Sequence, residues 1–192
     1  MNQRRSWIVL LCRMPSDPAR HRMALWRELR RAGAVPLGQA VWGLPDLPAV
    51  QPVLDRAREL ITLAHGDLLV ISASGYDDAA ARRLDELYAT QREQEWREFL
   101  ADCAKYLAEL DKEEATAKFT LAELDEEEQS LDRLRRWYRD LRARDLLGTS
   151  AAGEADVRLK ECARRLDDYA EQVYAAVADP GTDTGYGHTA RP

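Results

Sequence analysis

The sequence predicts an α+β protein in two parts, a sheet domain at residues 6–75 and a bundle of about three long helices at residues 77–178. Two observations carry this prediction. In the first part, short apolar runs of strand length alternate with two amphipathic helical stretches. In the second part, proline is absent until Pro180 and Ala, Leu, Glu and Arg dominate. Residues 179–192 are rich in Gly, Thr and Pro, and we expect them to form a disordered tail.

The first strand and helix are predicted from the N-terminal stretch. Trp7 to Leu11 is an apolar run of strand length. A turn follows, in which Asp17 is the expected N-cap and Pro18 the first helical residue. Gly33 is expected to end the helix as the residue just beyond its C-cap. Spacing places four apolar residues on one face of this helix: Leu25, Trp26, Leu29 and Ala32.

A hairpin, a second helix and a fourth strand complete the sheet domain. Residues 34–37 and 40–44 are apolar segments joined at Gly38-Gln39, which predicts a hairpin with Gly first in its turn. Residues 50–64 carry a helical apolar stripe, and residues 68–72 form a last apolar run. The order βαββαβ with two crossover helices is typical of a ferredoxin-like arrangement.

Three helical segments are predicted in the second half, because apolar residues there recur at alternating spacings of three and four. Thr120 and Glu123 form a capping box that starts the second segment, and residues 148–153 separate it from the third. The recurring residues are Trp96, Phe99, Cys103, Tyr106 and Leu110, then Leu131, Leu134, Tyr138 and Leu141, then Leu159, Cys162, Leu166, Tyr169, Val173 and Ala176.

Charge and cysteine usage limit the class of protein. The net charge is −6, yet residues 1–76 contain more basic than acidic side chains, so the acidic excess lies in the helical half. The three cysteines are far apart in apolar positions, which favours buried free thiols and a reducing cytoplasm. No apolar run approaches the roughly 20 residues that span a bilayer, so we expect no membrane segment.

Motifs of known chemistry are missing from the sequence. It has no phosphate-binding glycine loop, dinucleotide fingerprint or nucleophile elbow. Its three histidines lack a second ligand at metal-binding spacing, and the acidic run at residues 123–128 is expected to be a solvated helix face. We therefore predict no catalytic residues, no metal and no cofactor.

A cluster of arginines around the first helix is the remaining candidate site. A helix N-terminus with nearby guanidinium groups can hold an oxyanion, and clustered arginines can follow nucleic-acid phosphates. The competing interpretation is a solvated surface that pairs with the acidic helices. Arg20, Arg27 and Arg31 share one face, whereas Arg22 could pair with an acid of the later helices. The candidate anion-binding or DNA-binding residues are Arg13, Arg20, Arg22, Arg27, Arg30 and Arg31.

Three ordered patterns resemble the N-terminal domain of the ChrB family of chromate-resistance regulators. They are W-x-x-L-L-x-x-x-P from Trp7, R-x-x-x-W-R-x-L-R-x-x-G-A from Arg22, and G-x-x-V-W-x-L-P from Gly38. The later helices fit as well, at residues 87–96, 118–120 and 135–145. The resemblance implies a cytoplasmic, non-enzymatic regulator of chromate resistance, with DNA, or a chromate or sulfate oxyanion, as partner. A homodimer is a further possible state, formed through the ferredoxin-like part.

Two alternatives stay open. The βαββαβ half also resembles the middle domain of PaaX-type repressors and small ferredoxin-fold nucleases, which use an aspartate at the end of the first strand to bind metal. Here Cys12-Arg13-Met14 occupies that place and Asp17 lies in the turn, so a cation would meet an arginine. The other alternative is a helical protein-interaction module that binds no nucleic acid.

Overall fold

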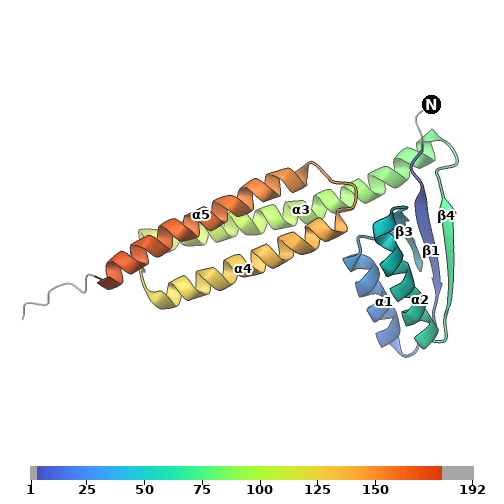
Figure 1. Cartoon of the computed structure of the whole chain (residues 1–192), viewed down its shortest axis with the longest axis horizontal. Coiled ribbons are helices and arrows are strands. Elements are labelled where there is room, and N and C mark those ends of the chain that lie inside the picture. The colour runs from blue at the N-terminus through green and yellow to red at the C-terminus, as the bar shows by residue number, and fades with distance from the viewer. Residues whose placement is uncertain (1–3, 179–192) are drawn as a thin grey trace, which may run out of the picture. The chain divides into compact units, whose positions relative to one another are not determined.

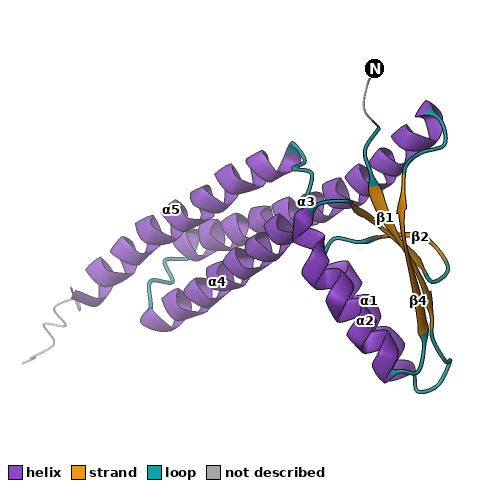
Figure 2. Ribbon diagram, turned by 45° about the vertical axis from the view of Figure 1, so that its right-hand side comes forward, coloured by secondary structure: helices purple, strands orange, loops and turns teal. Residues whose placement is uncertain are grey.

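The computed structural model describes residues 4–178 and contains a four-stranded antiparallel sheet and five α-helices, which confirms the α+β class. The predicted tail at residues 179–192 lies outside the described residues. Figure 1 shows the order of the elements along the chain, and Figure 2 shows the strands and helices by type. None of the helices within residues 4–178 is long and apolar enough to cross a membrane.

The sheet has the strand order β2-β3-β1-β4, with every neighbouring pair antiparallel. Its strands are β1 (Trp7–Arg13), β2 (Val35–Gly38), β3 (Val41–Pro45) and β4 (Asp67–Ala73). Helices α1 (Ala19–Arg31) and α2 (Gln51–Leu63) cover one face, and a single 3-10 turn at Pro48–Val50 leads into α2. Alternate residues of each strand point to opposite faces, so every second residue of β1 enters the core below the helices. That core includes Ile8, Leu10, Cys12, Leu25, Leu29, Leu44, Leu54, Ala57 and Ile61.

Three local predictions in this part need correction. Pro18, not Asp17, is the N-cap of α1, and no side chain caps that end, because the helix begins one residue later than predicted. In the hairpin, Gly38 still belongs to β2, and Ala40 is the turn residue with positive φ, at 60°. Trp26 is 44% exposed rather than packed with Leu25 and Leu29, because it lies at the margin of the apolar face. Gly33 follows the C-cap Ala32 with φ of 85°, as predicted.

Three long helices follow the sheet: α3 (Asp78–Ala115), α4 (Leu121–Arg144) and α5 (Ala151–Ala178). Thr120 caps α4 as predicted, since its Oγ1 accepts a hydrogen bond from the Glu123 amide at 3.2 Å. The second break lies three residues earlier than predicted, at residues 145–150, and Gly153 lies inside the first turn of α5. Most of the residues in the predicted seams are buried, and Ala176 is an exposed exception.

Contacts divide the chain into two compact units. Among the described residues, unit 1 comprises residues 4–101 and 136–156, and unit 2 comprises residues 102–135 and 157–178. The sheet, α1, α2 and the first part of α3 therefore belong to unit 1 together with the connection between α4 and α5. Cys12 is buried in unit 1, and Cys103 and Cys162 are buried in unit 2, so the prediction of three buried free thiols is confirmed. Whether residues 6–75 form a domain of their own stays a prediction.

Candidate functional site

A buried polar cluster lies in unit 1, on the side of α3 that faces the last turn of α1 and the end of α4. Tyr88 precedes Arg92 by four residues, and Glu95 and Trp96 follow Arg92 at three and four residues, so all three lie on the side of the helix that Arg92 occupies. All four are buried, and Arg92 is only 1% exposed. Its Nη2 donates to Glu95 Oε1 at 3.1 Å, and its guanidinium carbon lies 5.3 Å from the centre of the Tyr88 ring. The arginine side chain is thus part of the interior of the unit.

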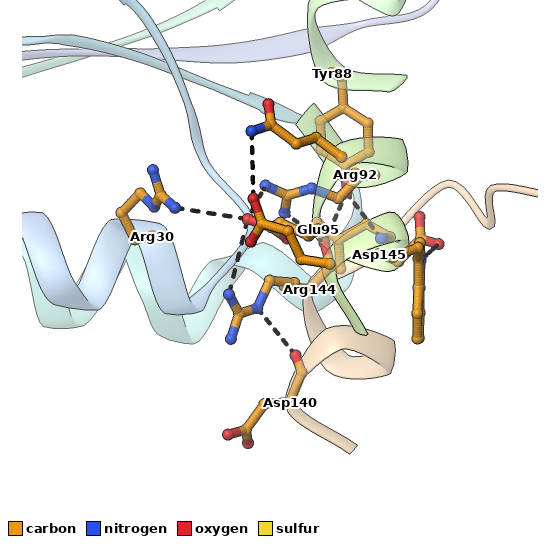
Figure 3. Close-up of polar contacts among 11 residues, drawn as sticks. Arg30, Tyr88, Arg92, Glu95, Asp140, Arg144 and Asp145 are labelled. Carbon is orange, nitrogen blue, oxygen red and sulfur yellow. Dashed lines mark hydrogen bonds and ion pairs between the residues drawn. The ribbon is translucent and has the colours of Figure 1, made fainter. Parts of the chain in front are cut away.

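Three arginines from distant parts of the sequence converge on the Glu95 carboxylate (Figure 3). Besides Arg92, the Nη2 of Arg30 lies 3.7 Å from Oε1, and the Nη1 of Arg144 lies 3.8 Å from the same oxygen. Arg30 comes from the last turn of α1 and Arg144 from the end of α4. The carboxylates of Glu95 and of the nearby buried Asp145 carry two negative charges against three guanidinium groups, so one positive charge remains in excess.

Burial has left some polar atoms of the cluster without a protein partner. Within residues 4–178, neither Arg92 Nε nor Glu95 Oε2 forms a hydrogen bond, although both atoms are buried. Burial lowers the pKa of the Arg92 guanidinium, with the charge of Glu95 acting in the opposite direction. The group still remains protonated near neutral pH. Burying these unpaired polar atoms lowers the free energy of unfolding. Other contacts of the cluster must therefore compensate for this loss.

The cluster anchors the end of α4 and the loop after it. Tyr88 Oη donates to the Arg144 carbonyl and accepts from the Leu146 amide, both at 2.8 Å. Burial raises the pKa of this Tyr88 hydroxyl. Asp145 accepts a 3.0 Å bond from Trp96 Nε1 and further bonds from the Thr149 amide and hydroxyl, both at 2.9 Å. The α4–α5 connection is therefore fixed to α3 by side chains that lie about fifty residues away in the sequence.

An open pocket of about 400 Å³ adjoins the cluster. Arg30 and Glu95 of the cluster line it, together with Arg83 and Glu98 of α3 and several neutral polar side chains. The pocket is mixed in charge and lies within unit 1.

The predicted arginines fall into two sets. Arg13, Arg20, Arg22, Arg27 and Arg31 are exposed to solvent. Arg30 is half-buried, since it packs over the ring of Trp26 with 5.3 Å between guanidinium and ring centre and faces Glu95 on its other side. By its position on the helix, Arg22 could pair with an acid of a later helix. Within the described residues Arg22 forms no ion pair, and Arg30 takes that role.

Arg20, Arg27 and Arg31 form the exposed basic stripe of α1. Successive helical residues turn by about 100°, so these three side chains fall on one narrow face opposite the buried Leu25 and Leu29. The stripe is a surface that an extended anion could follow.

Sequence reasoning missed Arg92, Glu95 and Arg144. The only signal for them was the position of Arg92 and Glu95 among the apolar residues of α3, on the face shared by Tyr88 and Trp96. Such a position indicates burial, but it does not identify the partners, which come from α1 and α4.

Comparison with known proteins identifies the family of this chain. The model of the family "Protein ChrB, N-terminal" matches residues 22–180. The chain therefore belongs to the ChrB N-terminal family. It is also similar to Protein ChrB of Cupriavidus metallidurans, with 27% identity over 123 residues that cover 64% of this chain. The aligned part is 34% of that relative, so the chain matches about a third of its length.

Proposed function

We propose that this chain is a non-enzymatic, cytoplasmic regulatory protein linked to chromate resistance, and that it acts by binding DNA through α1. Membership of the ChrB family supports the link to chromate resistance. The strand order β2-β3-β1-β4 supports a ferredoxin-like arrangement of the first part, as the element order predicted. The observation that carries the binding proposal is the exposed basic stripe of α1, formed by Arg20, Arg27 and Arg31.

The stripe has the properties that phosphate contacts require. Within residues 4–178 its three arginines form no ion pairs, whereas Arg56, Arg58 and Arg83 elsewhere in unit 1 each pair with a nearby acid. A guanidinium without an acidic partner can bind a phosphate without first breaking an internal pair. The last turn of α1 also holds Arg30 against Trp26, which keeps this cation out of the stripe.

The test measures how DNA affinity depends on salt. We expect the variant Arg20→Ala/Arg27→Ala/Arg31→Ala to bind an operator-length duplex more weakly at low salt. The slope of log affinity against log salt should decrease by about one per arginine lost, because each phosphate contact releases counterions. The matched control is Arg56→Ala/Arg58→Ala/Arg83→Ala, which removes the same charge from paired, exposed positions. Fluorescence anisotropy across a salt series gives both slopes.

An unchanged salt slope in the α1 variant would contradict the proposal. A control variant whose salt slope decreases by the same amount would also contradict it. If the wild type bound no duplex at low salt, the helical interaction-module hypothesis would be favoured. Divalent-metal-dependent cleavage of the duplex would instead favour the nuclease hypothesis.

A second candidate is oxyanion binding at the Arg30–Glu95–Arg144 cluster. The observation that favours it is the excess of guanidinium groups beside an open pocket, with Arg30 and Arg144 both at long distances from Glu95. These two cations could turn toward a sulfate or chromate ion. Isothermal titration with each anion tests this, and Arg30→Gln should abolish the heat of binding whereas Arg27→Gln should leave it unchanged.

A further inference from the structure

The face of the sheet that points away from α1 and α2 carries an aliphatic surface. Strand alternation puts Val9, Leu11 and Arg13 of β1 on this face, because Ile8, Leu10 and Cys12 enter the core on the other side. The register then places Ile71, Leu69 and Asp67 of β4 directly opposite them.

Unit 1 covers only one end of this face. At the start of β1, Trp7 is 1% exposed, and its ring packs edge-on against Tyr88 of α3 with 5.9 Å between the ring centres. Further along the strands Leu69 is 52% exposed and Ile71 is 40% exposed. The central patch, which we define as Val9, Leu11, Val41, Leu69 and Ile71, therefore meets solvent in unit 1. Leu69 and Ile71 are exposed and Val9, Leu11 and Val41 are half-buried beside them. Contiguous aliphatic side chains that reach solvent in this way are typical of an interaction surface.

A pair of opposite charges marks the far end of the patch. Arg13 on β1 and Asp67 on β4 lie directly opposite each other in the register, and both are exposed. Within residues 4–178 neither of them forms an ion pair. The patch thus ends in a cation on one strand and an anion on the next, each free to pair with another molecule.

We propose that the central patch is the interface of a symmetric homodimer, in which a second copy of this chain packs its own patch against it. The two-fold axis runs parallel to the strands, between β1 and β4, so β1 of one copy lies over β4 of the other. Leu11 then contacts the partner's Leu69, and Arg13 pairs with the partner's Asp67. This inference rests on the sheet alone and is independent of the DNA-binding proposal.

Charge complementarity is the reason to choose a second copy as the occupant. A two-fold interface brings the same surface together twice, so it must be complementary to itself. The patch meets this condition because its centre is aliphatic and its end carries one cation and one anion side by side. The two-fold rotation places the cation of each copy opposite the anion of the other. A nucleic acid would find no donors in the aliphatic centre to bind its phosphates or base edges.

The first experiment measures oligomeric state by sedimentation equilibrium of the 192-residue chain. We expect a wild-type mass of twice the 21.8 kDa of one chain. Leu69→Asp should weaken dimerisation by about a hundredfold or more, because it buries an unpaired charge at the interface. The matched control is Leu63→Asp, which changes an aliphatic residue that is 67% exposed on α2 and should leave the dimer intact. Circular dichroism verifies that both variants are folded.

The second experiment tests the orientation of the two copies by reversing the charges of two exposed residues, Arg13 and Asp67, which lie outside the hydrophobic core. Arg13→Asp alone and Asp67→Arg alone should each weaken the dimer by about tenfold, because like charges then meet across the interface. The double variant Arg13→Asp/Asp67→Arg should recover the wild-type dissociation constant. A monomeric wild type, or a dimer unaffected by Leu69→Asp, would overturn the proposed interface. Failure of the double variant to recover would overturn the proposed axis.

Discussion

Each unit of the molecule buries one glutamate among cations, and the two sites are built differently. In unit 1, Glu95 is 9% exposed and is faced by three arginines, of which Arg92 is itself buried. In unit 2, Glu113 is 2% exposed and is faced by two lysines. The Nζ of Lys118 lies 3.2 Å from its carboxylate and that of Lys112 lies 3.8 Å away, and both lysine side chains are about half exposed.

The difference follows from the chemistry of the two cations. A guanidinium has five N–H donors in a planar fork and is weakly hydrated, so Arg92 can sit inside the unit and bond Glu95 and a backbone carbonyl at once. An ammonium group is strongly hydrated, so Lys112 and Lys118 reach Glu113 from the surface while their charged ends stay in water. We therefore expect the cluster of unit 1 to be more sensitive to substitution than that of unit 2.

The five tryptophans allow the two units to be followed separately. All of them lie in unit 1, at positions 7, 26, 42, 96 and 137, so tryptophan fluorescence reports the unfolding of that unit. Far-UV circular dichroism follows the helices of both units.

The largest effect is expected for Arg92→Ala. The change leaves Glu95 buried with only two distant cations and opens a cavity beside Tyr88, so the free energy of unfolding should fall by about 3–5 kcal/mol. Urea denaturation followed by tryptophan fluorescence measures this. Arg83→Ala on the same helix is the control, since Arg83 is 69% exposed and its loss should change stability little. If both variants lost a similar free energy of unfolding, the conclusion that the buried Arg92 stabilises unit 1 would be wrong.

Gly33→Ala should be the next most damaging change, because it disturbs the backbone of the same cluster. The residue has φ of 85°, and an added Cβ would come within 2.3 Å of the Arg144 carbonyl oxygen. Backbone strain and this clash should together cost about 2–3 kcal/mol. Gly38→Ala is the control, because open space surrounds Gly38. Equal fluorescence-detected midpoints for the two variants would contradict the structure at this turn.

Lys118→Ala should destabilise unit 2 by less than Arg92→Ala destabilises unit 1. The hydrogen bond to Glu113 raises the pKa of Lys118, so the stabilisation is present up to the ordinary lysine pKa of 10.5 and is lost as the pH rises above it. Circular dichroism of urea unfolding at pH 7 and above pH 11 checks both statements, because the variant and the wild type should converge at the higher pH. A difference that grows with pH would be inconsistent with this ion pair.

The smallest expected effect is a gain from Glu127→Gln. Glu127 is 7% exposed, and burial raises its pKa, with four nearby glutamates adding to the shift. A raised pKa means that the folded state disfavours the ionised carboxylate, so the penalty is present at neutral pH and disappears as the pH falls through the folded pKa. Glu127→Gln should therefore stabilise unit 2 at pH 7 by about 0.5 kcal/mol, with no gain at pH 4. Glu126→Gln, at an exposed neighbour, serves as the control.

Much of the architecture was predictable from the sequence. Alternation and helical periodicity depend on residues that are close in the chain, so they located the four strands, the two short helices and the three long ones. The glycine at position 33 and the capping threonine at position 120 act within one turn and were predicted for the same reason. The family was also recognisable, because its motifs are ordered along the chain.

Tertiary structure alone decided which arginines are buried and what they bind. Arg30, Arg92 and Arg144 look alike as residues of charged helices, and only the packing of α1, α3 and the end of α4 within unit 1 brings them to Glu95. The exposure of Trp26, at the margin of the apolar face of α1, likewise depends on which residues pack against that margin, and helical spacing does not specify them. Local periodicity places a side chain on a face of its own element. Which neighbour meets that face depends on contacts between residues far apart in the sequence, and these exist only in the folded chain.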